Sequence, residues 1–74
     1  MQDKVINALA EALEMDGGII KPEDNFRDYE NYSSLTELSM LAMLDSEFGI
    51  ELEMKDYNKL KTVADIIELV SSRL

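Results

Sequence analysis

The chain has 74 residues, with no cysteine and no histidine, and its 16 acidic and seven basic side chains give it a net charge of −9. This length suits one small domain, so we expect residues 1–74 to form a single domain. The composition excludes disulfides, thiolate chemistry and the commonest zinc ligands, and the acidity argues against a nucleic-acid binder, which needs a basic surface.

The first predicted element is a helix over residues 3–15, with the sequence DKVINALAEALEM. Apolar side chains recur at the spacing of one helix face, and the alanines between them favour a helix. The face consists of Val5, Ile6, Leu9 and Leu13. The Asp-Gly-Gly sequence at residues 16–18 is expected to end this helix.

A long connection over residues 16–33 follows. Loops of this length in a compact domain tend to be functional. We expect its apolar and aromatic side chains to anchor it on a core; these are Ile19, Ile20, Phe26 and Tyr29. Residues 23–53 hold nine of the acidic side chains and one base, Arg27, so this segment should steer basic partners towards itself.

A second helix is predicted over residues 34–48, ending before Gly49, and it has two apolar stripes. The expected core stripe consists of Met40, Leu41, Leu44 and Phe48. The opposite stripe consists of Leu35, Leu38 and Ala42. A helix packed on one face does not need the second stripe, so it is a candidate surface for binding a partner.

Two further helical segments complete the chain. KDYNKL, residues 55–60, predicts a short helical turn, and TVADIIELVSSRL, residues 62–74, predicts the last helix, with Thr62 and Asp65 as a capping box. The apolar face of this helix consists of Val63, Ile66, Ile67, Val70 and Leu74. No pair of strands with a hairpin turn is evident. We therefore predict an all-α fold: a small bundle of three long helices and one short helix, with a long first loop.

The adjacent serines at the start of the second helix allow two interpretations. Ser34 and Glu37 match a capping box, which would give Ser34 a purely structural role. The first turn of a helix also has unpaired N–H groups that could hold a phosphate ester on a serine. Since the chain lacks an activated nucleophile of its own, we expect no catalytic residue and no metal site, and a contribution to chemistry by carrying a prosthetic group.

The stretch YSSLTELSMLAMLDSEFGIEL, residues 32–52, resembles the acyl carrier protein family around its modified serine. The resemblance implies that Ser34 carries 4′-phosphopantetheine, with Leu35 following it and Ser33 in place of the family's aspartate. The arm would supply the thiol that the chain lacks, and acyl groups would be carried as thioesters. The implied partners are a phosphopantetheinyl transferase and acyl-loading and acyl-processing enzymes with basic surfaces, in fatty-acid, polyketide or other specialised lipid biosynthesis.

The resemblance also implies a partner surface and a cargo site. The partner contacts would be Leu35, Leu38, Ala42, Asp45 and Glu51. Acidic positions that the family uses along this helix are Thr36, Ser39 and Ser46 here, which favours a specialised rather than a housekeeping member. In this family the core can open to admit an acyl chain, so we expect the core to be able to do so here.

Two further expectations concern the state of the protein. No apolar run approaches the ~18 residues of a membrane span, and the N-terminal sequence lacks a signal-peptide pattern, so we expect a cytoplasmic protein without a membrane span. We also expect it to be a monomer. The alternative function is a carrier-like helical interaction module without a prosthetic group, which would bind a partner through the stripe of Leu35, Leu38 and Ala42.

Overall fold

The computed structural model describes residues 2–73 and is all-helical over that range. Its elements are α1 (Gln2–Leu13), the 3₁₀ turns η1 (Gly17–Ile19) and η2 (Phe26–Asp28), α2 (Ser34–Phe48), α3 (Met54–Tyr57) and α4 (Val63–Arg73). Over the same residues the sole β-type pairing is an isolated bridge between Asn25 and Thr62. The predicted all-α bundle of three long helices and one short helix, with a long first loop, is confirmed.

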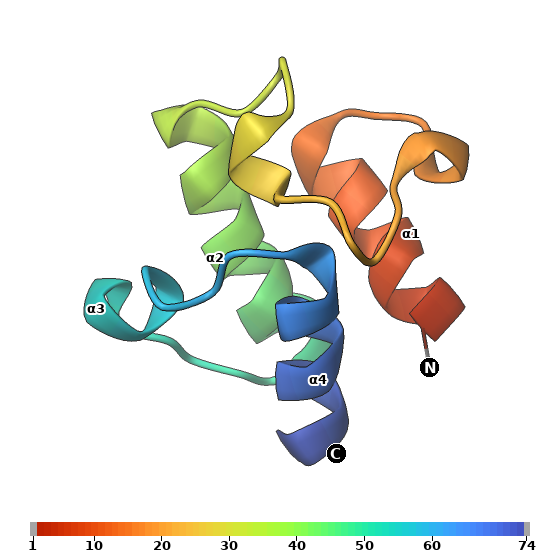
Figure 1. Cartoon of the computed structure of the whole chain (residues 1–74). Helices are drawn as coiled ribbons and strands as arrows, with labels where there is room; N and C mark the ends of the chain where they lie inside the picture. Colours follow the sequence, from red (N-terminus) through yellow and green to blue (C-terminus); the bar gives the residue numbers. More distant parts are fainter. Residues whose placement is uncertain (1, 74) are drawn as a thin grey trace.

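The helices are arranged so that the start of α2 is remote from the start of α1. Helices α1 and α2 pack against each other, and α1 also contacts α4. Figure 1 shows α1 and α2 running in opposite directions, with the long loop crossing over between them. The first turn of α2 therefore lies at the end of the molecule away from the beginning of α1 and the end of α4.

The core contains most of the side chains that the helical patterns predicted. The predicted residues that are buried are Val5, Leu9, Leu13, Met40, Leu44, Phe48, Val63, Ile66 and Val70. Ile6, Leu41 and Ile67 lie at its edge and are only partly buried. Leu74, predicted on the same face of the last helix, lies outside the described residues.

The end of α1 differs from the prediction. The helix stops at Leu13, because Glu14 adopts a left-handed conformation with φ 57° and the N–H of Met15 donates back to the Ala10 carbonyl at 2.9 Å. The Asp-Gly-Gly sequence follows Met15 and starts η1 instead of ending α1, because Asp16 caps η1 by accepting from the Gly18 N–H at 2.8 Å. Left-handed geometry favours glycine, so a glutamate at this position gave no sequence signal for the end of the helix.

The two isoleucines of the loop also behave differently from each other. Ile20 is buried as predicted, whereas Ile19 is 59% exposed, so the expectation that both anchor the loop is wrong. Ile19 is the last residue of the 3₁₀ turn η1, whereas Ile20 follows it with an extended backbone (φ −90°, ψ 122°), so the two side chains point in different directions and only Ile20 reaches the core. Phe26 is fully buried and Tyr29 is partly buried, as expected of loop anchors.

The remaining helix ends follow local sequence. Gly49 ends α2 in a left-handed conformation, with φ 66° and its N–H on the Asp45 carbonyl. Thr62 and Asp65 form the predicted capping box: Thr62 Oγ1 accepts from the Asp65 N–H at 3.2 Å, and Asp65 Oδ2 accepts from the Thr62 N–H at 3.0 Å. The backbone N–H groups of Thr62 and Lys61 that donate to Asp65 lower the pKa of that carboxyl. Helix α3 is shorter than the predicted 55–60 segment.

Candidate functional site

The start of α2 is organised by Ser33 rather than by Ser34. Ser33 has an extended backbone and is the N-cap: its Oγ accepts from the Thr36 N–H at 3.4 Å, and Thr36 Oγ1 accepts from the Ser33 N–H at 2.6 Å. Of the two interpretations of the serines, the capping box of Ser34 with Glu37 is not the one formed, and the cap belongs to Ser33. Threonine in place of glutamate closes this box with a hydroxyl, which the usual Ser-x-x-Glu pattern does not anticipate.

Ser34 is the first residue of the helix, and it is exposed. Since Ser33 and Thr36 make the capping bonds, the Ser34 hydroxyl is left without a hydrogen-bond partner among residues 2–73. The backbone N–H groups of Ser34 and Leu35 belong to the first turn of a 15-residue helix, where intrahelical acceptors are missing. This donor set and the positive end of the helix dipole suit a phosphate ester on the Ser34 oxygen.

The loop before the serines is fastened at two points. The Asn31 side chain donates to the carbonyl of Glu14, just beyond the end of α1, at 3.3 Å. The Tyr32 hydroxyl donates to Glu37 Oε2 at 3.1 Å, so Glu37 binds the tyrosine and does not cap the helix. These contacts fix the position of Ser33 and Ser34 relative to α1 and α2.

One neighbour of the site was not identified from the sequence. Tyr57, at the end of α3, is fully buried, and its hydroxyl lies 2.8 Å from that of Tyr32. The two residues are 25 positions apart, and neither lies in a pattern that predicts their contact. The only available signal was the aromatic character of Tyr32 directly before the serines.

The outward side of α2 presents the second apolar stripe, here called the outer ridge: Leu35, Leu38 and Ala42. Leu35 is 75% exposed and Leu38 is 60% exposed, so the helix is oriented as the wheel predicted. Asp45 and Glu51, the two acidic residues expected to meet partners, are exposed as well. The structure thus brings the predicted partner residues to the surface.

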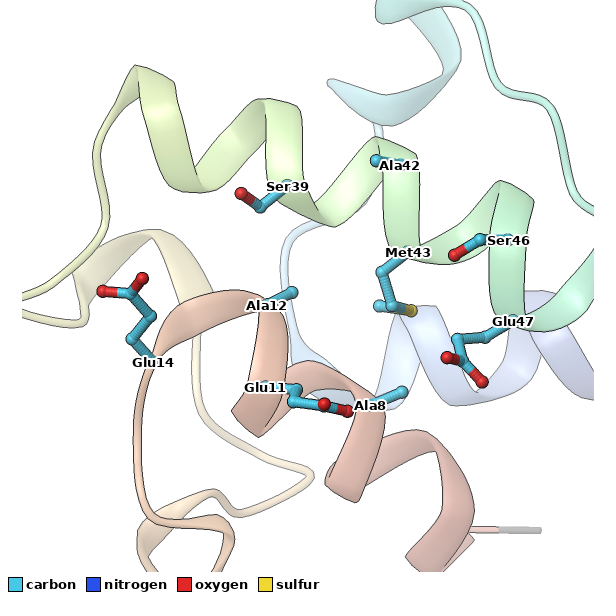
Figure 2. A pocket seen from close by; sticks show the side chains of 9 residues that line it. All are labelled: Ala8, Glu11, Ala12, Glu14, Ser39, Ala42, Met43, Ser46 and Glu47. Carbon is cyan, nitrogen blue, oxygen red and sulfur yellow. The ribbon is translucent and has the colours of Figure 1, made fainter.

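A shallow groove of about 350 Å³ lies between α1 and α2 (Figure 2). Its walls combine small apolar side chains with serines and carboxylates; the lining consists of Ala8, Glu11, Ala12, Glu14, Ser39, Ala42, Met43, Ser46 and Glu47. A second hollow of about 330 Å³ shares Ala12, Glu14 and Ser39 with it and reaches Ser33 and Leu35. Open space near the serines therefore lies on the α1 side of α2.

Residues 2–73 contain neither a metal-binding cluster nor a membrane-spanning helix. No cluster of three or more potential ligands drawn from Asp and Glu is placed to hold a metal ion there. None of the described helices has the length and apolarity needed to cross a membrane.

Comparison with known proteins gives the family. The family model for the phosphopantetheine attachment site matches residues 3–70. An acyl carrier protein of Thermosynechococcus vestitus is 31% identical over 72 residues, covering 97% of this chain and 89% of the relative. Acyl carrier proteins of Rickettsia canadensis and Rickettsia typhi are each 30% identical over 73 residues, covering 99% of this chain and 85% of the relative.

These matches extend over nearly the whole chain. The cofactor of the family is 4′-phosphopantetheine, and its members are carriers rather than enzymes. These carriers work with a phosphopantetheinyl transferase and with enzymes that act on the acyl group. The first turn of α2 offers an exposed hydroxyl and backbone N–H donors that fit a phosphate ester. The chain belongs to the acyl carrier protein family.

Proposed function

We propose that Ser34 is the attachment site of 4′-phosphopantetheine and that residues 1–74 act as one monomeric carrier domain. The observation that carries this proposal is the division of work between the two serines. Ser33 is held by the capping bonds, whereas the Ser34 hydroxyl is exposed and unpaired within the described chain. A transferase can approach such a hydroxyl without undoing the helix cap.

The attachment forms a phosphodiester. The Ser34 oxygen attacks the pantetheine-linked phosphorus of coenzyme A, the pyrophosphate bond breaks, and adenosine 3′,5′-bisphosphate leaves while the serine proton passes to a base on the transferase. The new phosphate lies beside the first-turn N–H groups of α2, which favour a negative charge at that position. The bound arm then supplies a thiol on which acyl groups form thioesters.

The outer ridge supports the second part of the proposal, which concerns partners. Leu35 and Leu38 offer exposed apolar contacts directly beyond the serine, and Asp45 and Glu51 add negative charge nearby. Apolar anchors govern how long a complex lasts, and rim charges govern how often it forms. We therefore assign the ridge to enzymes with basic surfaces around an apolar contact, in fatty-acid, polyketide or another lipid pathway.

Intact mass spectrometry after incubation with coenzyme A and several phosphopantetheinyl transferases tests the attachment. We expect one phosphopantetheinyl group on the wild type, none on Ser34→Ala, and one on the matched variant Ser33→Ala. Modification that survives in Ser34→Ala and is lost in Ser33→Ala would show that the arm is attached to Ser33 and that the proposed site is wrong. A wild type left unmodified by every transferase would favour the helical interaction module instead.

A further inference from the structure

An aromatic cluster lies near the start of α2, on the side of the helix opposite the two grooves. Tyr57 and Phe26 are both fully buried, and their ring centroids are 5.9 Å apart. The Phe26 ring also contacts Tyr32, with centroids 5.8 Å apart. Since Tyr32 directly precedes the two serines, the cluster joins α3 and the loop turn η2 to the backbone that positions Ser34.

The hydroxyl groups of the cluster form a directed chain of hydrogen bonds. Tyr32 donates its proton to Glu37 at 3.1 Å, so the 2.8 Å contact between the two phenols is a donation from Tyr57 to the Tyr32 oxygen. Burial raises the pKa of both phenols, so both are neutral at physiological pH. Glu37 belongs to the first turn of α2, so this series of hydrogen bonds connects α3 to the start of α2.

Arg27 closes the cluster from the loop side. Its guanidinium lies 4.8 Å from the centroid of the Phe26 ring and 5.0 Å from that of Tyr57. It donates to the Tyr57 carbonyl at 3.0 Å and to the Leu60 carbonyl. The backbone at the end of α3 is thus held by the same residue that contacts the Tyr57 ring.

The grooves between α1 and α2 are shallow, and more polar than apolar side chains line them, so an alkyl chain would gain little from entering there. Entry on the other side of α2, towards α3, would have to displace the aromatic cluster. The Tyr57 ring would leave its buried position, and the hydroxyls of Tyr57 and Tyr32 would lose each other as partners. An alkyl chain offers no acceptor or donor in exchange, and buried polar groups without partners are strongly disfavoured. The Arg27 contacts oppose the same movement, because they hold the end of α3 to η2.

We infer that this carrier keeps its cargo outside the helical bundle, that Tyr57 is the residue that closes the bundle to it, and that the cargo is therefore a short or polar acyl group. The inference rests on the proposed arm at Ser34. It departs from the expectation, taken from the family resemblance, that the core opens for an acyl chain. A long alkyl chain gains from burial with each methylene, whereas a short or polar acyl group loses little by staying in water.

The test compares thioesters of two lengths. A transferase supplied with acetyl-coenzyme A or octanoyl-coenzyme A loads the wild type, Tyr57→Ala and the control Tyr29→Ala, and hydroxylamine cleavage of each thioester is timed against the free acyl-pantetheine. In the wild type we expect both thioesters to be cleaved at the rates of their free counterparts. In Tyr57→Ala we expect octanoyl cleavage to slow roughly tenfold, which burial of about two methylene groups suffices to produce.

The outcomes separate this inference from the function on which it rests. If the mass spectrum shows no arm on Ser34, the proposed attachment is wrong. A loaded wild type whose octanoyl thioester is protected defeats the inference alone, and this result is decisive even if Tyr57→Ala does not fold. Equal protection in Tyr57→Ala and Tyr29→Ala would mean general loosening, and no protection in a folded Tyr57→Ala would remove the role assigned to Tyr57.

Discussion

The inward and outward sides of α2 are both rich in leucine, but they differ in what surrounds them. Leu44 on the inward side is fully buried among side chains of the other helices, whereas Leu38 on the outward side is 60% exposed. The same residue type therefore contributes to stability on one side and is available to a partner on the other. The contrast shows that the apolar pattern of a helix does not by itself say how many of its faces are core.

Truncating one leucine on each side gives the largest expected difference. Leu44→Ala should lower the free energy of unfolding by about 2–5 kcal/mol, because it leaves a cavity in a packed core. Leu38→Ala should change it by less than about 0.5 kcal/mol, as surface substitutions usually do. Urea denaturation of both variants measures the difference.

The same pair of variants separates stability from recognition. Leu38→Ala should slow modification by the transferase several-fold, while its unfolding curve stays close to that of the wild type. An unfolding cost for Leu38→Ala similar to that of Leu44→Ala would show that the outward side is packed, and the comparison would then fail. A normal transfer rate would remove the outer ridge from the transferase contact.

Alkaline pH tests the tyrosines on the inward side, where Tyr32 donates to Glu37 and Tyr29 donates to Asp24. Burial raises the pKa of Tyr57 and Tyr32, and burial together with donation to Asp24 raises that of Tyr29 to about 12. The unfolded chain releases these protons near pH 10, earlier than the folded protein does. Stability from the neutral phenols is thus complete below about pH 10 and falls as the pH rises through 10 towards 12.

Urea unfolding at a series of alkaline pH values measures this loss, with Tyr32→Phe as the comparison. The variant lacks one of the shifted phenols, so its stability should fall less steeply with pH than that of the wild type. Stability that stays constant across the range would mean that the phenols titrate alike in both states, and the buried hydroxyl chain would then have no energetic role.

The junction of the two sides, at the start of the helix, gives a smaller effect. Ser33→Ala should lower the free energy of unfolding of the unmodified protein by about 0.5–2 kcal/mol, the usual cost of losing a serine N-cap. Ser34→Ala should not destabilise it, because the Ser34 hydroxyl makes no capping bond and alanine favours a helix. Thermal unfolding followed by circular dichroism compares the two, and the reverse order of stabilities would return the cap to Ser34.

Salt should give the smallest effect, through the charges outside the core. Within residues 2–73 the two ion pairs are solvent-exposed, joining Lys55 to Glu53 at 3.5 Å and Lys59 to Asp56 at 3.9 Å, and neither contributes much. Most of the excess acids therefore repel one another, and screening should raise the melting temperature between about 0.01 M and 0.15 M salt. Magnesium chloride should act more strongly than sodium chloride at equal ionic strength, and a flat response would mean that the acids are too far apart to interact.

The sequence alone determined the helical class, the acidic character and the serine at the start of α2. Those features depend on residues close together in the chain: the spacing of apolar side chains, Gly49 after the last turn of α2, and the Thr62 and Asp65 capping pair. The orientation of α2 also followed from its pattern, since the outer ridge is exposed as the wheel predicted. Such short-range preferences act before any tertiary contact forms.

Only the tertiary structure decided which serine caps the helix, which isoleucine of the loop is buried, and what lies beneath the first turn of α2. Ser33 and Ser34 are chemically equal candidates, and the structure gives the cap to Ser33, which exchanges hydrogen bonds with Thr36. Asn31 and Tyr32 hold the preceding loop against Glu14 and Glu37. Tyr57 meets Tyr32 across 25 positions because α3 packs against the long loop. No local pattern specifies a contact of that separation, because it depends on how all the elements fill the same core.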